Sequence, residues 1–198
     1  MKKRILLLSI IALTALGNTI SAKHNHSDIT INTKVSSVEW IGKKITGQHS
    51  GQITIKEGTL NLHDGHLSGG VVVMDMTSIT CTDIKPEEGG DKLVGHLNSP
   101  DFFDTKNNPT ATLTITEVKK MEGNKHMVSG NLTIKGITKP ISFPATIEMK
   151  DGKLGAYAEM NIDRTLYDIK YGSGKFFEDL GNKAIADEFT IKFKIAAQ

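Results

Sequence analysis

Apolar and polar residues alternate along most of the chain. Val72, Met74 and Met76 fall on one face of their segment, and residues 131–135 and 188–195 alternate in the same way. Because successive side chains of a strand point to opposite faces, each of these segments has one apolar face and one polar face. The pattern predicts half-buried β-strands and very little helix.

Turn-forming residues separate the strands. Asp151-Gly152 is typical of a type I′ hairpin turn, which needs positive φ at both central residues, and Asp64-Gly65 and Lys56-Glu57-Gly58 mark further turns. Short strands joined by such turns indicate an antiparallel meander, which is either a closed barrel or a sandwich. We predict eight or nine strands, at residues 28–42, 46–56, 58–62, 67–79, 110–119, 126–136, 140–150, 153–163 and 186–196.

One connector carries the main helical signal. Residues 91–97 place leucines four apart on one face, which predicts a short helix. Ser99 is then expected to cap a second helical turn, with Pro100 at its first position. That turn presents Phe102 and Phe103. Residues 91–104 are therefore expected to cover one end of a barrel, with one phenylalanine anchoring the connector and the other bordering the interior.

The N-terminus has the features of a secretory signal. A basic segment at residues 2–4 precedes an apolar run at 5–16, and small residues end at Ala22, where we expect cleavage. The apolar run is too short for a membrane span, and the only cysteine, Cys81, lies far from the cleavage site. We predict a signal peptide at 1–22, one domain at 23–198, a periplasmic or secreted location and no stable membrane anchor.

Charge argues against nucleic acid as a partner. The formal net charge is +2 for the whole chain, and three positive charges leave with the predicted leader. The lysines are scattered, and no basic run is interleaved with aromatic residues. A concentrated basic face, which phosphate binding requires, is not expected.

Motifs of catalysis and metal binding are weak. The chain has no Gly-x-Ser-x-Gly, no His-Glu-x-x-His and no P-loop. His24-x-His26 and His63-x-x-His66 suit zinc or copper chemically, but they lie in a tail and a turn, so we predict no metal and no cofactor. Asp163 and Asp168 flank Arg164, which we interpret as an ion pair at a strand end rather than a catalytic pair.

Several segments, in this order, resemble the YceI-like polyisoprenoid-binding family of secreted bacterial proteins. The similarity extends from about residue 28 to 196, and its most specific part is Gly130-Asn131-Leu132-Thr133-Ile134-Lys135-Gly136-Ile137-Thr138-Lys139-Pro140. The sequence departs from the family pattern at Lys135, where histidine is common, and at Tyr167-Asp168-Ile169. The other matching segments are residues 36–40, 51–60, 75–79, 96–104 and 109–112.

The resemblance implies an all-β fold, namely an antiparallel eight-stranded lipocalin-like β-barrel with a short helical connector. It also implies an apolar cavity that holds a polyprenyl, quinone or fatty-acyl chain, and members are not known as enzymes. Methionines on inward faces suit such a ligand because they are flexible and polarizable. The expected lining is Val38, Trp40, Ile53, Val72, Met74, Met76, Phe102, Phe103, Leu132, Ile134, Phe143, Ala145, Ala158, Met160, Phe189 and Ile191.

Two histidines keep an alternative open. His49 and His96 flank apolar segments, and in a lipid carrier they would meet a polar headgroup near the barrel mouth, together with Asn98 or Lys92. The same two residues could instead serve an enzyme, either a hydrolase or a metal-assisted isomerase. A purely structural or adhesive role, with a barrel filled by side chains, is a third hypothesis, and apolar residues at the rim would equally serve a homodimer.

Overall fold

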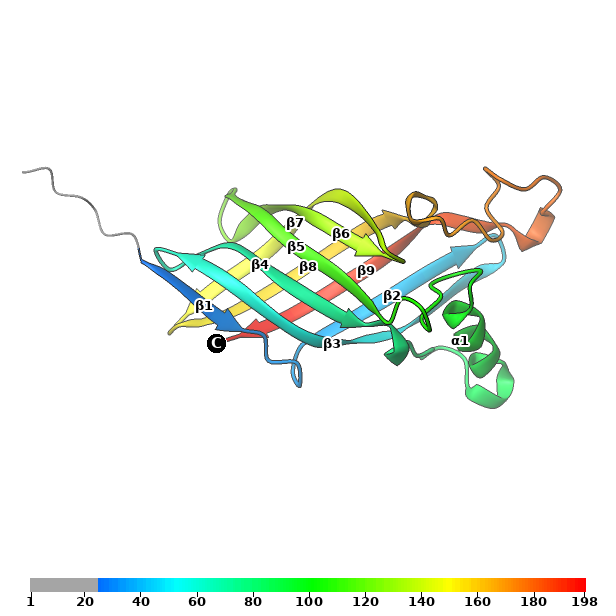
Figure 1. Cartoon of the computed structure of the whole chain (residues 1–198), viewed down its shortest axis with the longest axis horizontal. Coiled ribbons are helices and arrows are strands. Elements are labelled where there is room, and N and C mark those ends of the chain that lie inside the picture. Colours follow the sequence, from blue (N-terminus) through cyan, green and yellow to red (C-terminus); the bar gives the residue numbers. More distant parts are fainter. Residues whose placement is uncertain (1–24) are drawn as a thin grey trace, which may run out of the picture.

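The computed structural model describes residues 25–198, so the predicted leader at 1–22 lies outside the described residues. These residues form one antiparallel sheet of nine strands (Figure 1). The strands are β1 (His26–Thr30), β2 (Ser37–Lys44), β3 (Gly47–His63), β4 (His66–Asp75), β5 (Thr110–Lys120), β6 (Lys125–Ile134), β7 (Ile137–Lys150), β8 (Lys153–Asp163) and β9 (Ile185–Ala197).

The sheet closes on itself. Its strand order is β1-β3-β2-β9-β8-β7-β6-β5-β4, and β4 also pairs with β3. β2 pairs with the first part of β3 up to Ile53, whereas β1 pairs with its last part from Thr59. β1 and β2 therefore share one position around the barrel, which confirms the expected closed eight-stranded antiparallel barrel.

The prediction of one strand at 28–42 was wrong, because a turn divides β1 from β2. The carbonyl oxygen of Asn32 accepts hydrogen bonds from the backbone N–H groups of Val35 (3.3 Å) and Ser36 (3.1 Å). The Asn32 side chain also accepts one from the N–H of Lys34 (3.2 Å). Such local bonds by asparagine compete with the sheet ladder, and they end the strand here.

The prediction of separate strands at 46–56 and 58–62 was also wrong, since β3 runs without interruption through this region. The Lys56-Glu57-Gly58 signal corresponds to a β-bulge, where the register with β4 shifts between Ile55 and Glu57. A Cβ at Gly58 would lie 2.5 Å from Cδ1 of Ile31. Gly58 therefore allows Ile31 to pack closely against β3, and it does not form a turn.

The two ends of the barrel differ (Figure 1). At the hairpin end, Asp151 (φ 51°) and Gly152 (φ 74°) make the predicted type I′ turn between β7 and β8, and the β3–β4 and β5–β6 turns lie beside it. The connector end carries the two long connectors, at residues 76–109 and 164–184, with the β2–β3 and β6–β7 turns. Short helical segments occur in these connectors: η1 (Met76–Ser78), η2 (Pro86–Glu88), η3 (Arg164–Tyr167) and η4 (Gly181–Lys183).

The predicted connector helix is present as α1 (Gly90–Asn98), at the connector end. The assignment of Ser99 as an N-cap was wrong, because its hydroxyl donates to the carbonyl oxygen of His96 (2.8 Å) and ends α1. The Ser99 carbonyl then accepts from the N–H groups of Phe102 (3.0 Å) and Asp104 (2.9 Å). The chain thus forms a tight turn in place of a second helical turn, and it still delivers both phenylalanines to the barrel end.

Candidate functional site

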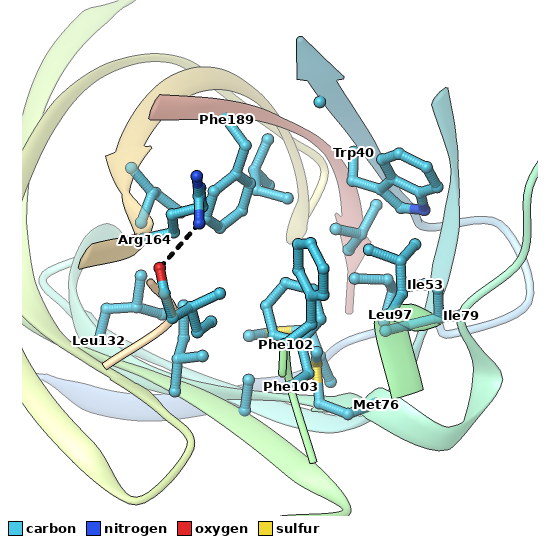
Figure 2. A pocket seen from close by; sticks show the side chains of 18 of the residues that line it. Trp40, Ile53, Met76, Ile79, Leu97, Phe102, Phe103, Leu132, Arg164 and Phe189 are labelled. Atoms are coloured by element: carbon cyan, nitrogen blue, oxygen red, sulfur yellow. Dashed lines mark hydrogen bonds between the residues drawn. The ribbon is translucent and has the colours of Figure 1, made fainter. Parts of the chain in front are cut away.

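An apolar cavity, the main cavity, lies inside the connector end of the barrel. It encloses about 950 Å³ of space between atoms, which includes the space at its open mouth. Leu97, Phe102 and Phe103 of the first connector border it at this end, and barrel strands supply most of the remaining wall (Figure 2). Lys43, Arg164 and Glu188 are the charged residues of a lining that is otherwise almost entirely hydrocarbon.

Most of the residues expected to line a cavity border this one. They come from several strands of the barrel and from the connector, and they are Val38, Trp40, Ile53, Met74, Met76, Phe102, Phe103, Leu132, Ile134, Met160, Phe189 and Ile191. The remaining four, Val72, Phe143, Ala145 and Ala158, border a second, smaller cavity, the lower cavity. Its other walls include Leu60, Leu67 and Leu154, whose strand positions place it toward the hairpin end.

Phe102 and Phe103 both border the main cavity, so the expected division of roles between them does not hold. The Phe102 ring also packs against His96, with centroids 4.8 Å apart, and against Tyr171 at 5.6 Å. The Phe103 ring meets Phe189 edge to face at 6.2 Å. These contacts join the first connector to the second and to β9, and the paired rings form the cover of the cavity (Figure 2).

The first connector is also fastened along the edge of β3 that β4 leaves free. The backbone N–H of Thr80 donates to the carbonyl oxygen of Gln52 (3.0 Å), and the Thr80 carbonyl accepts from Nε1 of Trp40 (3.0 Å). A Cβ at Gly51 would overlap that carbonyl oxygen. Glycine is therefore required at Gly51 for the connector to approach, and this approach also orients the Trp40 indole in the cavity wall.

Beside the cavity, β2 and β9 pair irregularly. Gly42 pairs with Phe189, but Lys44 pairs with Ile185, so β9 has two more residues than β2 over this stretch. Such a bulge interrupts the ladder and bends the strand. The exposed residues Lys43 and Glu188 border the cavity at this point, so the ladder is interrupted where one residue of each charge meets the cavity wall.

Arg164 holds the second connector over the barrel. Its side chain is only 4% exposed, and its guanidinium donates to four backbone carbonyls, a geometry that suits its planar set of five donors. Burial works to lower the pKa of this guanidinium, whereas Asp187 and Asp163 work to raise it. The acceptors are Ala186 (2.9 Å), Ile169 (2.9 Å), Tyr171 (2.8 Å) and Ile185 (3.1 Å), and one bond is drawn in Figure 2.

The aspartates that flank Arg164 form ion pairs with lysines and not with Arg164 as expected. Asp163 lies 3.0 Å from Nζ of Lys175, and Asp168 lies 2.6 Å from Nζ of Lys170. The carboxylate nearest to the guanidinium is that of Asp187, at 3.8 Å. Arg164 thus acts mainly through carbonyl oxygens, and its role is to fold the connector that borders the cavity.

The two histidines expected at a headgroup lie outside the cavity lining. Nδ1 of His49 is 3.0 Å from Oδ2 of Asp83. Burial works to raise the pKa of Asp83. Hydrogen bonds from the Ser50 N–H, His49 and Cys81 together outweigh this effect and lower the pKa to about 2. His96 packs its ring on Phe102 and on Tyr171 (4.6 Å) above the cover. Asn98 and Lys92 also lie outside the lining.

His26, His63 and His66 of the two histidine motifs lie close together on the barrel wall, whereas His24 lies outside the described residues. The rings of His26 and His63 lie 4.6 Å apart, and His63 pairs with His66 across the β3–β4 hairpin. Within residues 25–198, no three His, Cys, Asp or Glu side chains are grouped so as to hold a metal ion. In the same residues, no helix is both long and apolar enough to cross a membrane.

Comparison with known proteins assigns the family. A family model described as the YceI-like domain matches residues 23–197. The chain belongs to the YceI-like domain family. Among curated relatives, a UPF0312 protein of Photorhabdus laumondii is 50% identical over 58 residues, 29% of each chain. UPF0312 protein PA0423 of Pseudomonas aeruginosa is 44% identical over 63 residues, 31% of this chain and 32% of that protein. These matches span less than a third of either relative.

Solved structures share the YceI-like fold. BcnA of Burkholderia cenocepacia aligns with a TM-score of 0.65 and 23% identity, over 85% of this chain and 99% of its own. A polyisoprenoid binding domain from Saccharophagus degradans, implicated in plant cell wall breakdown, aligns with a TM-score of 0.63 and 14% identity, over 86% and 97%. At these identities the comparison establishes the fold alone.

Proposed function

We propose that this YceI-like protein binds lipid and holds one long apolar chain in the main cavity, as a carrier or a sequestering module. The chain would be a polyprenyl, quinone or fatty-acyl tail, and the place of action would be the periplasm or the outside of the cell. The observation that carries the proposal is the apolar cavity itself, bordered by Phe102 and Phe103 on the connector and by Lys43 on β2. The Saccharophagus domain, described as polyisoprenoid binding, and the predicted leader at 1–22 give further support.

The lining accounts for binding without specific polar contacts. A ligand chain that buries about 300 Å² of apolar surface gains roughly 7 kcal/mol at 25 cal/mol per Å². Part of this gain is offset by the ordering of the flexible chain, which favours ligands whose length and shape fit the cavity. Recognition by shape is consistent with the composition of the wall, whose charged residues are Lys43, Glu188 and Arg164. The guanidinium of Arg164 is already hydrogen-bonded to four backbone carbonyls.

The mouth of the cavity would lie between β2 and β9, and the polar headgroup would remain there. Lys43 offers an ammonium group to a phosphate or carboxylate, and Glu188 offers an acceptor to a hydroxyl. Apolar side chains are also exposed on the loops of this end of the barrel. They would ease the passage of a lipid from another apolar phase, and they are Ile45, Leu166, Tyr171, Phe176 and Phe177.

The two alternatives are less well supported by the geometry. His49 and His96, which motivated the enzyme hypothesis, lie outside the cavity lining. A structural or adhesive role predicts a barrel filled by side chains, whereas this barrel has an apolar cavity at its connector end. Lipid binding is the function that uses the observed space.

Trp40 offers a direct test of the proposal. It is the only tryptophan of the chain, it is 8% exposed, and it lines the main cavity. Titration of the purified protein with menaquinone should quench Trp40 fluorescence and saturate near one quinone per protein. Geranylgeraniol should compete and restore the emission, because both molecules carry a prenyl chain.

Free N-acetyltryptophanamide serves as the control for light absorption by the quinone. Quenching that is linear and equal for the protein and the free amide, with no competition by geranylgeraniol or palmitic acid, would rule out a lipid in this cavity.

A further inference from the structure

Two buried side chains border both cavities. Leu113 of β5 and Phe193 of β9 line the main cavity, and both also line the lower cavity. Each is less than a tenth exposed. The two compartments of the barrel therefore meet at these two residues.

Leu113 and Phe193 lie on opposite walls. Going around the barrel from β5 to β9, three strands intervene in one direction (β6, β7 and β8) and three in the other (β4, β3 and β2). Both side chains point inward, because both line the interior spaces. They therefore extend toward each other across the barrel.

The register places both residues at the boundary between the compartments. Leu113 pairs with Leu132, which lines the main cavity, and with Val72, which lines the lower cavity. Phe193 likewise pairs with Val38, which lines the main cavity, and with Ala158, which lines the lower cavity.

We propose that Leu113 and Phe193 form a septum that sets the maximum length of the apolar chain held in the main cavity. This inference rests on the proposed function, since it concerns the same ligand. A chain that reaches the septum fills the main cavity, and further carbons must stay outside the mouth in water. Added length then brings no additional burial and no additional affinity.

Truncation of the phenylalanine should join the cavities. In Phe193→Ala, removal of the ring leaves an apolar passage into the lower cavity, and a longer chain gains contacts there. The matched control is Phe143→Ala, because Phe143 is equally buried but lines only the lower cavity. Both variants lose a core ring and should be destabilised to a similar degree.

The experiment measures the affinity of farnesol, geranylgeraniol and solanesol, which are prenyl alcohols of increasing length, by their competition with menaquinone at Trp40. For the unchanged protein and Phe143→Ala, affinity should stop rising at the same alcohol. For Phe193→Ala it should continue to rise, with solanesol bound at least about tenfold more tightly than by the unchanged protein.

The outcomes separate this inference from the proposed function. Binding of the alcohols by all three proteins with one common length profile would overturn the septum and leave lipid binding intact. Failure of the unchanged protein to bind any of the alcohols, menaquinone or palmitic acid would overturn the proposed function. If Phe193→Ala does not fold, Leu113→Ala opens the septum from the opposite wall and should produce the same shift, and an unchanged profile in that variant would refute the septum.

Discussion

Replacement of Arg164 by methionine should lower the free energy of unfolding by about 3–5 kcal/mol, which is the usual cost of removing one side of a buried charged network. Methionine keeps an apolar stem of similar length but has no donors, so the four carbonyls that Arg164 now binds lose their partner. The carboxylate of Asp187 also loses the guanidinium at 3.8 Å and keeps only Nζ of Lys175, at 3.2 Å. Urea denaturation followed by circular dichroism measures the change.

Two further variants define what the arginine contributes. Arg164→Lys keeps the charge but places three donors on one nitrogen, so it should recover only part of the loss. Lys192→Met, on the outer side of β9, removes a cation that lies 3.9 Å from Glu39 and should change stability by less than about 1 kcal/mol. A loss of less than about 1 kcal/mol for Arg164→Met as well would show that the carbonyl network does not hold the second connector.

Replacement of Ala111 by phenylalanine should nearly abolish lipid binding while the fold persists. Ala111 is buried on β5 and faces the main cavity, so the larger ring would occupy the space proposed for the ligand. A ring that displaces about 100 Å² of ligand contact costs about 2.5 kcal/mol of binding free energy. This corresponds to an affinity about 60-fold weaker, measurable by menaquinone titration of Trp40.

Ala145→Phe is the matched control. It introduces the same ring, but into the lower cavity, which Ala145 lines. Both variants should stay folded, with a packing cost of about 1–3 kcal/mol. Ala145→Phe should bind menaquinone within about twofold of the unchanged protein. Equal affinity in all three proteins would place the quinone outside the main cavity.

The barrel could be predicted from the sequence where local rules act alone. Strict alternation reports which face of a strand is buried, so Met74 and Met160 were correctly expected to point inward. Asp151-Gly152 was correctly expected to form its hairpin turn, because few other residue pairs tolerate positive φ at both positions. These signals depend on neighbouring residues only, and tertiary contacts do not change them.

The errors arose where one residue type serves two purposes. Gly58 was interpreted as part of a turn, but it lies within β3 and makes room for Ile31, a contact created by the return of a distant strand. Ser99 is as suitable chemically for ending a helix as for beginning one, and the hydroxyl bonds backward to His96. Spacing alone cannot distinguish these uses.

The polar part of the site could not be predicted, because barrel closure assembles it. Lys43, Arg164 and Glu188 come from β2, the second connector and β9, and they line one cavity only when β8, β9 and β2 are neighbours. One signal was available for Arg164: it is the only arginine after residue 4. A lone arginine among many lysines suggests a site that needs a planar, multidentate donor, and such a site can be structural.

The central claim is that the main cavity holds one apolar chain. Its most direct test is mass spectrometry of the purified protein under native conditions and of its organic extract, with Ala111→Phe prepared in parallel. The account predicts one bound prenyl, quinone or acyl lipid for each unchanged protein molecule and a large reduction in the variant. An unchanged protein that carries no lipid, and that takes up none from a total bacterial lipid extract, would contradict it.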